Sequence, residues 1–350
     1  MVDSCAESRS LVRVPIQTAL RRLGGTEVNQ CSMTPVTDAA EWAALFSRVD
    51  HPHMTQSWDY GEAKQAAVGW RTRRVVADAG GWRTRRLVFE RGGEPVAICQ
   101  LLDKSLAGIR WASRLNRGPL FLDADPGNDL VRDVYGALRG RRKHLRGVLV
   151  LAPALAADPE NYRMLTELGF RDRHLPGWLS SRVDLHLDEE QLRKSLAPTW
   201  RNRLRVAERS GLEIRISQAP EDVEWIIDRH VENMKEKDFV GPGPTLVRAL
   251  YHAAPDDDFL VFQARLAEEA VGGMMVYRFG HVAEYYVGWM GPQGRAVNVG
   301  NFLYWQVALE LQRRGCRWFD LGGMSLGGTG PFKRGMRGVE YELLNEWLAF

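Results

Sequence analysis

The two halves of the chain are predicted to contain the same order of elements: helices, three neighbouring strands, a helix, a strand, a helix or loop, and a last strand. In the first half the three strands are expected over residues 73–78, 85–90 and 95–102. In the second half they are expected over residues 258–266, 270–279 and 281–289. The connections within each set are too short for a crossover, so the strands must be antiparallel. The doubled order predicts an α+β chain in which two domains of one fold follow each other.

The length supports this division, because 350 residues make about two domains at roughly 150 residues each. Residues 1–34 are polar, rich in arginine and weakly patterned, so we expect an N-terminal extension there. The first domain is expected over residues 35–178 and the second over residues 179–350. The last strand of the second domain is expected over residues 340–348.

Composition excludes several classes of protein. With 45% hydrophobic residues the chain can build packed cores, and a net charge of +3 is too small for a histone-like polycation. Its four cysteines are far apart, which disfavours a disulfide framework or a structural zinc site. No segment approaches about 18 consecutive apolar residues, and the N-terminus lacks the apolar core of a signal peptide. We therefore expect a cytoplasmic protein without stable membrane association.

The sequence contains no nucleophile–histidine–acid order, no Walker loop and no cluster of metal-ligand residues. Neither a metal nor a cofactor is therefore predicted. The run Asp256-Asp257-Asp258 is interpreted as a solvated loop before a strand.

The last fifty residues carry the most specific pattern. A helical run over residues 298–314 ends at Gly315 and is followed by a short apolar strand with Asp320, a glycine-rich loop and the step Phe332-Lys333. This order resembles the C-terminal signature of the Fem-type peptidyltransferases, whose two domains are of the GNAT type. Members of that family move an amino acid from aminoacyl-tRNA to an amine, usually on a peptidoglycan precursor. The resemblance implies two tandem GNAT-like domains, aminoacyl-tRNA as donor and an amine-bearing acceptor.

The resemblance makes Lys333 the principal catalytic candidate. In the family the lysine of the Phe-Lys step lies near the reacting ester, where it could stabilise the oxyanion or the departing ribose oxygen. Phe332 is expected to anchor this lysine and to line the substrate site.

An early motif also resembles the family: Gln56-Ser57 precedes a helix that contains Trp58 and Lys64. Ser57 is expected to cap this helix. The resemblance implies that Lys64 approaches a phosphate of the acceptor, with Trp58 in the same substrate-binding region. Without the resemblance, a single helical lysine would be expected to face solvent.

Arginines follow one stripe of the helix predicted over residues 199–210. Arg201, Arg205 and Arg209 are spaced at i, i+4 and i+8, while Trp200, Leu204 and Ala207 fall on another face and can pack inward. Aligned guanidinium groups can hold the phosphates of a nucleic acid or nucleotide. The helix resembles the basic helix that opens the second domain in Fem-type proteins.

We therefore include Arg201, Arg203 and Arg205 among the substrate-binding candidates. The alternative is an ordinary solvated helix face.

Two tyrosines and one aspartate complete the candidates. On an alternating strand Tyr285 would share a face with Val287 and Trp289, and Tyr286 with Gly288. The space beside a glycine favours Tyr286 as the catalytic residue and leaves Tyr285 to bind substrate, although both could be core aromatics. Asp123 follows a turn that resembles the family's Arg-Gly-Pro and is a candidate base; the alternative is that no side chain serves as base.

The favoured reaction is aminolysis of an aminoacyl-tRNA ester, which needs no covalent enzyme intermediate. The main alternative is an acyl-CoA N-acyltransferase of the GNAT class. Such enzymes bind a pyrophosphate with a glycine-rich loop at a helix start, but here Ala296 replaces the required glycine. A non-catalytic RNA-binding module is a third possibility, supported only by the arginines. The acceptor is expected to be a peptidoglycan precursor or a peptide-like antibiotic or metabolite, because the long helical hairpin of many cell-wall members is missing from the sequence.

Overall fold

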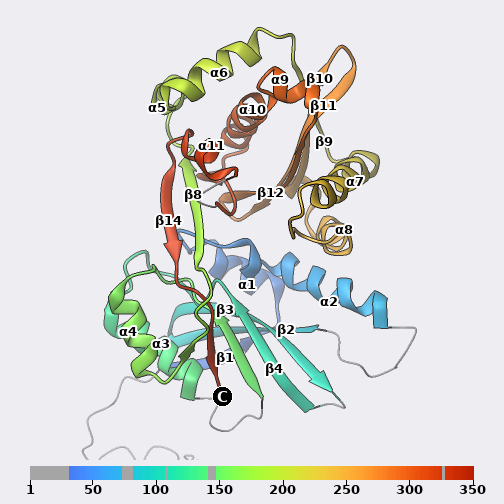
Figure 1. Cartoon of the computed structure of the whole chain (residues 1–350). Coiled ribbons are helices and arrows are strands. Elements are labelled where there is room, and N and C mark those ends of the chain that lie inside the picture. The colour runs from blue at the N-terminus through green and yellow to red at the C-terminus, as the bar shows by residue number, and fades with distance from the viewer. Residues whose placement is uncertain (1–30, 73–81, 107–108, 141–146, 325–327) are drawn as a thin grey trace, which may run out of the picture.

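The computed structural model describes residues 31–72, 82–106, 109–140, 147–324 and 328–350 (Figure 1). Most of the expected extension and the strand expected over residues 73–78 lie outside these residues. The end of the expected extension belongs to the first domain, because Ser32–Val36 form a strand that pairs with the next strand along its whole length.

The first sheet has the strand order β1-β2-β3-β4-β6-β15-β7, with β5 paired to β3. Its strands are β1 (Ser32–Val36), β2 (Trp82–Arg91), β3 (Glu94–Leu106), β4 (Ile109–Asn116), β5 (Leu120–Phe121), β6 (Val148–Ala152), β7 (Arg171–Asp172) and β15 (Trp347–Ala349). The antiparallel pairing of the strands expected over residues 85–90 and 95–102 is confirmed, and β4, which the sequence pattern did not predict, pairs with β3 as the next strand. The adjacent pair β4 and β6 is parallel. Helices α3 (Gly127–Gly140) and α4 (Pro159–Glu167) pack on one face of this sheet.

The second sheet has the order β14-β8-β13-β12-β11-β10-β9. Its strands are β8 (Trp178–Asp184), β9 (Glu213–Ser217), β10 (Phe259–Leu266), β11 (Glu269–Phe279), β12 (Val282–Met290), β13 (Trp318–Asp320) and β14 (Val339–Leu343). The antiparallel strands β10 to β12 confirm the meander expected in the second half. As in the first sheet, the meander ends in a strand with a parallel neighbour, here β13 beside β12.

One face of the second sheet is covered by helices from the second half of the chain. These helices are α5 (Glu189–Ser195), α6 (Pro198–Glu208), α9 (Pro292–Ala296), α10 (Val299–Arg313) and α11 (Gly330–Arg334). Trp200, Leu204 and Ala207 of α6 are buried in this core, as expected from their spacing.

The other face of the second sheet packs against helices from both halves of the chain. These helices are α1 (Ala39–Phe46), α2 (Trp58–Thr72), α7 (Pro220–Glu236) and α8 (Pro244–Ala253). Figure 1 shows α1 and α2 between the two sheets. Trp42 and Tyr60 of these helices share one hydrophobic core with Tyr277, Val282 and residues of the first sheet. The two domains are therefore joined by a common core.

The C-terminal segment returns to the first sheet. The single strand expected over residues 340–348 is in fact two strands: β14 pairs with β8 in the second sheet, and β15 pairs with β6 and β7 in the first. The buried Trp347 of β15 packs in the core of the first sheet, which explains why the chain crosses back. Residues 347–349 thus extend the first sheet, although we expected them in the second domain.

Candidate functional site

The parallel strands β12 and β13 separate soon after they begin to pair. Only Val282–Glu284 pair with Trp318–Asp320, after which β12 continues to Met290 while the other chain segment turns into the glycine-rich loop. Lys333 of α11 lies at this separation. Its Nζ donates a hydrogen bond to the carbonyl oxygen of Gly323 (2.8 Å) and lies 4.8 Å from the centre of the Tyr285 ring.

The Lys333 side chain is only 3% exposed. Burial lowers the pKa of its ammonium group to about 8, although the nearby carboxylates of Asp320 and Glu284 favour the charged form. A lysine with this pKa can both donate and accept a proton near neutral pH. The structure thus places Lys333 in a chemically suitable environment, and its catalytic role stays a prediction.

Asp320 fixes the backbone to which Lys333 is tied. Its Oδ1 accepts hydrogen bonds from Ser180 Oγ (2.5 Å) and from the Gly322 amide (2.9 Å), while Oδ2 accepts one from Tyr341 OH (2.5 Å). Arg182 Nε lies 3.4 Å from Oδ2. The carboxylate therefore connects β8, β13 and β14 to the turn that carries Gly323.

A second buried carboxylate lies beside Asp320 on the neighbouring strand. Glu284 is the Cα partner of Asp320 across β12 and β13. Its Oε1 is 3.5 Å from Nη1 of Arg117, a residue of the first domain, and the Arg117 guanidinium lies 3.6 Å from the centre of the Trp178 ring. Burial raises the pKa of Glu284 to about 7, while Arg117 opposes this shift.

Sequence reasoning selected neither Glu284 nor the residues that surround the Glu284 and Asp320 carboxylates. Their common property is that each meets its partner only through the tertiary fold. They are Arg117, Trp178, Ser180, Arg182, Glu284 and Tyr341. Two sequence signals were present: Glu284 is a charged residue inside an otherwise apolar strand, and Arg117 belongs to the turn that resembles the family's Arg-Gly-Pro.

A β-bulge in β12 corrects the expected faces of the two tyrosines. Val276 pairs with Tyr285 and Met275 pairs with Val287, so Tyr286 is the extra residue. After the bulge, the side chains of β12 therefore point to the faces opposite to those expected, and Gly288 lies on the same face of the strand as Tyr285. A Cβ on Gly288 would be 2.7 Å from the Tyr285 hydroxyl oxygen, so the Tyr285 ring already fills the space that we assigned to a ligand of Tyr286.

Tyr285 is the tyrosine on the side of Lys333, stacked on Tyr304 at 5.6 Å between ring centres. Tyr286 faces the core between the domains, and its hydroxyl group is buried without a hydrogen-bond partner among the described residues. Tyr286 and Lys333 therefore lie on opposite faces of β12.

Phe332 packs between α6 and α10. Its ring centre is 5.9 Å from that of Trp200 and 5.1 Å from that of Tyr304, and a Cβ on Gly300 would be 3.4 Å from the ring. Phe332 thus anchors α11, as expected, and contacts the first turn of α10.

The segment before α10 is folded on itself. The amides of Arg295, Val297 and Asn298 donate to backbone carbonyls within α9 and the residue before it. A pyrophosphate loop requires such amides to point at the ligand. These three amides are therefore not available to a pyrophosphate.

The early motif holds the first sheet and the second domain together. The side chain of the buried Gln56 donates to the carbonyl oxygens of Gln100 and Asn116 and accepts from the Gln100 amide, so it bridges β3 and β4 just beyond the last pair of their ladder, Leu101 and Leu115. Ser57 Oγ accepts from the Tyr60 amide (3.3 Å), which confirms the expected cap of α2.

Trp58 and Lys64 take different positions on α2. The guanidinium of Arg86 lies 3.4 Å from the centre of the Trp58 ring, which indicates a packing role for Trp58. Lys64 is half-buried with Nζ 5.6 Å from the centre of the Tyr60 ring. Burial and the nearby charge of Arg114 lower the pKa of Lys64. Lys64 is therefore not a fully solvated helical lysine.

The arginines of α6 lie on its outer side. Arg203 and Arg205 are exposed and Arg201 is half-buried. Arg201 Nη1 donates to the Lys194 carbonyl oxygen (3.4 Å) and Arg205 Nη1 to Asn202 Oδ1 (3.3 Å), but no carboxylate of the described residues pairs with either guanidinium. These charges remain free for an anionic ligand, and their role stays a prediction.

Asp123 lies apart from these groups. It is exposed, its Oδ1 accepts a hydrogen bond from the Asp125 amide (3.0 Å), and it lines a cavity of about 600 Å³ with His53, Arg182 and Tyr341. Within the part of the chain that the structure describes, no contact joins Asp123 to Lys333. Its role as a base therefore has no geometric support.

Two further findings concern metals and membranes. Among the described residues, no group of three or more histidine, cysteine, aspartate or glutamate side chains could hold a metal ion. Within the same residues, every helix is too short or too polar to cross a bilayer.

Comparison with known proteins identifies the fold. Residues 194–334 match the family model of the acetyltransferase (GNAT) domain. FemX superimposes with a TM-score of 0.71 at 14% identity, covering 91% of this chain and 96% of FemX. The chain has the Fem-type fold of two GNAT-like domains in tandem.

Two other solved structures share parts of this Fem-type arrangement. A tandem GNAT protein from the clavulanic acid biosynthesis pathway has a TM-score of 0.51 at 13% identity, covering 91% of this chain and 98% of that protein. The C-terminal domain of a candidate lysylphosphatidylglycerol synthetase from Agrobacterium fabrum has a TM-score of 0.50 at 15% identity, covering 89% and 92%. No curated protein sequence matches the chain. At these identities the structures establish the fold alone.

Proposed function

We propose that this protein transfers an amino acid from aminoacyl-tRNA to an amine acceptor and forms an amide bond. The observation that carries the proposal is Lys333, buried where β12 and β13 separate, hydrogen-bonded to Gly323 and holding a pKa of about 8. The Fem-type fold supports the same reaction class. The acyltransferase fold on which the proposal builds is supported by the GNAT domain match and by the similarity to FemX.

The reaction requires one proton to move from the amine to the ribose oxygen. The neutral acceptor amine attacks the ester carbonyl, a carbon–nitrogen bond forms, and the carbonyl oxygen becomes an oxyanion. The Lys333 ammonium group donates to that oxyanion and then gives a proton to the ribose oxygen as the carbon–oxygen bond breaks. The neutral lysine then takes the surplus proton from the new amide nitrogen. The enzyme needs no covalent intermediate, because alignment of amine and ester already lowers the barrier.

The α10 terminus argues against coenzyme A as the donor. Phe332 contacts Gly300 in the first turn of α10 and Trp200 of the neighbouring helix α6, and the amides of Arg295, Val297 and Asn298 are used within α9 and the residue before it. An acyl-CoA N-acyltransferase remains the alternative, because the GNAT domain match favours it.

The cationic groups outside the Lys333 site suit phosphate ligands. Arg201, Arg203 and Arg205 on α6 and Lys64 on α2 are proposed to contact phosphates of the tRNA or of a nucleotide-linked acceptor. The proposed acceptors are a peptidoglycan precursor or a peptide-like metabolite such as an antibiotic intermediate. Use of charged tRNA implies a reaction in the cytoplasm.

The decisive experiment is transfer of a radiolabelled amino acid from a mixed pool of charged tRNA to metabolites of a cell extract. RNase treatment before the reaction should abolish the labelled amide product, and the Lys333→Met variant should form it more slowly by about 100-fold or more. A product that resists RNase and depends on added acyl-CoA would refute the tRNA donor and establish the alternative. Mass measurement of the product identifies both the amino acid and the acceptor.

A further inference from the structure

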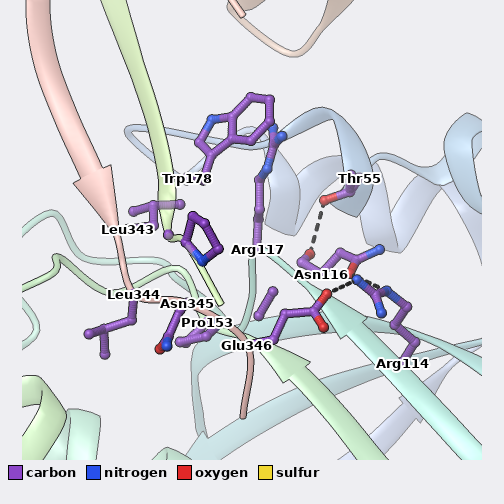
Figure 2. Close-up of a pocket in the computed structure, with 13 residues that line it drawn as sticks. Thr55, Arg114, Asn116, Arg117, Pro153, Trp178, Leu343, Leu344, Asn345 and Glu346 are labelled. Carbon is purple, nitrogen blue, oxygen red and sulfur yellow. Dashed lines mark hydrogen bonds and ion pairs between the residues drawn. The ribbon is translucent and has the colours of Figure 1, made fainter. Parts of the chain in front are cut away.

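A cavity of about 280 Å³ lies at the carboxyl ends of the parallel strands β4 and β6 in the first domain (Figure 2). Each sheet has one such parallel pair beside its meander, so this position corresponds to the separation of β12 and β13 in the second sheet. The lining includes residues of both sheets. The polar and aromatic groups used below are Arg114, Asn116, Arg117, Trp178, Asn345 and Glu346.

Two lining residues carry buried N–H donors without an acceptor. Arg117 Nη1 and Trp178 Nε1 have no hydrogen-bond partner in the described part of the chain. The Arg117 side chain is 13% exposed, and its closest carboxylate oxygen, on Glu284, is 3.5 Å away, too far for a good hydrogen bond. These two nitrogen atoms have almost no accessible surface, so a ligand in the cavity reaches Arg117 through the part of its side chain that remains exposed.

The charges around the cavity do not cancel. Figure 2 shows Arg114 joined to Glu346 and to Asn116, while Arg117 stands beside the Trp178 indole. Glu346 also pairs with Arg173, so its single negative charge serves two arginines. Burial raises the pKa of Glu284, the carboxyl group that faces Arg117, and its oxygen stays 3.5 Å from the guanidinium nitrogen. The cavity therefore favours an anionic group.

The cavity adjoins the Lys333 site through Trp178. A Cβ on Gly323 would lie 2.9 Å from the indole, and the carbonyl oxygen of the same glycine accepts the Lys333 hydrogen bond. Glu284 interacts electrostatically with both Arg117 and Lys333. A small molecule bound at Arg117 is thus close to the reaction centre.

The volume of the cavity limits the size of the ligand. At roughly 30 Å³ for each water of the bulk liquid, the cavity has the space of about nine waters, which suits part of an amino acid or short peptide and is below the usual range for larger ligands.

We propose that this cavity binds the carboxylate of the amine acceptor, which is an amino acid or a short peptide. The proposal rests on the proposed transfer function where it identifies the ligand as the acceptor. Binding of a carboxylate in the cavity does not depend on that function. Arg117 holds the carboxylate by charge-assisted hydrogen bonds across its planar guanidinium group. Trp178 supplies the wall toward Lys333.

Binding is tested by calorimetry on the full chain without tRNA, so that no turnover occurs. The probes are diglycine and L-alanyl-L-alanine, each compared with its C-terminal amide. We expect the acids to bind about tenfold more tightly than the amides, because the amides lack the charge. Arg117→Gln should remove this difference, whereas Arg132→Gln, which changes an exposed arginine that pairs with Glu167 and does not line the cavity, should retain it.

Equal binding of acids and amides, or no binding of either at millimolar concentration, would overturn the proposal. If Arg117→Gln fails to fold, Arg117→Lys retains the charge without the planar fork and should lower the preference for the acids. An unchanged preference in that variant would also overturn it. Carboxylate binding together with acyl-CoA-dependent transfer would refute only the tRNA donor. Transfer from tRNA without carboxylate binding would refute only the cavity.

Discussion

Lys333 donates a hydrogen bond from Nζ to the carbonyl oxygen of Gly323 over 2.8 Å, which ties a buried ammonium group to the segment that leaves β13. The lysine belongs to α11, and the carbonyl belongs to the turn held by Asp320. The Lys333 side chain therefore has two opposing effects, one on catalysis and one on stability. The charge supports the proposed chemistry, while its burial lowers the stability of the fold.

Replacement of Lys333 by methionine should separate these two roles. Burial lowers the folded-state pKa from 10.5 to about 8. The folded state therefore binds the proton less tightly than the unfolded chain, and stability is reduced at every pH below 8 and recovers as the pH rises toward 10.5. Lys333→Met removes that cost, so urea unfolding at pH 7 should show a gain of about 1–3 kcal/mol. Turnover should fall by about 100-fold or more.

The matched control is Lys194→Met on α5, where the lysine is exposed and pairs with Glu190. This variant should change neither stability nor turnover. Normal turnover of Lys333→Met would remove the lysine from the site, and a large loss of stability would contradict the cost of burying its charge.

The rate should also depend on the protonation of Lys333. The proposed reaction uses the ammonium form, which is lost as the pH rises through about 8. We therefore expect kcat/KM to decline above this pH in the wild-type protein. Lys333→Arg, whose side chain stays charged, should lose this alkaline limb even if its rate is lower. The measurement is a pH profile of both proteins under identical donor and acceptor concentrations. An identical alkaline decline of kcat/KM in both proteins would mean that a group other than Lys333 causes it.

The sequence predicts the elements around Lys333 better than the contacts between them. The meander of β10 to β12 and the helix α10 are predictable because their apolar periodicity and glycine ends are local signals. The step Phe332-Lys333 could be selected because a family pattern marks it. Ser57 was assigned correctly as a cap because a capping residue acts within its own helix.

The errors have physical causes that act over long distances. A single bulged residue, Tyr286, reverses the strand faces, and nothing in its local sequence marks it. The pair Arg117 and Glu284 connects the two domains across 167 positions, and the pair Arg182 and Asp320 joins two strands of the second sheet across 138 positions. Neither pair could be inferred from spacing. The return of β15 to the first sheet depends on the burial of Trp347 in a core formed by distant residues.

Asp320 should position Lys333 without taking part in the chemistry. Asp320→Asn keeps the shape but loses the charge that faces Arg182 and one acceptor for Tyr341 or Ser180. An uncompensated buried arginine costs about 3–5 kcal/mol, so the free energy of unfolding should drop by a large part of that amount. Tyr341→Phe removes a single hydrogen bond and should cost about 1 kcal/mol.

The distinguishing measurement for Asp320 is the pH profile. If Asp320 positions the lysine and favours its charged form, the alkaline limb should move to lower pH in Asp320→Asn. Tyr341→Phe, which keeps the carboxylate, should leave the limb in place. A limb that does not move in Asp320→Asn would limit Asp320 to a structural role.

The arginines of α6 should contribute a salt-dependent part of tRNA binding. Arg201 and Arg205 donate only to neutral groups, the Lys194 carbonyl and the Asn202 amide oxygen, so their charges are available to phosphates. Replacement of Arg201, Arg203 and Arg205 by alanine should weaken tRNA binding and reduce the slope of log K against log salt by about one for each phosphate that is no longer neutralised. Arg229→Ala on α7, where the arginine pairs with Glu232, serves as the control and should keep the wild-type slope. Filter binding over a range of salt concentrations measures both effects. A wild-type slope in the α6 variants would mean that this helix face is solvated and does not touch the nucleic acid.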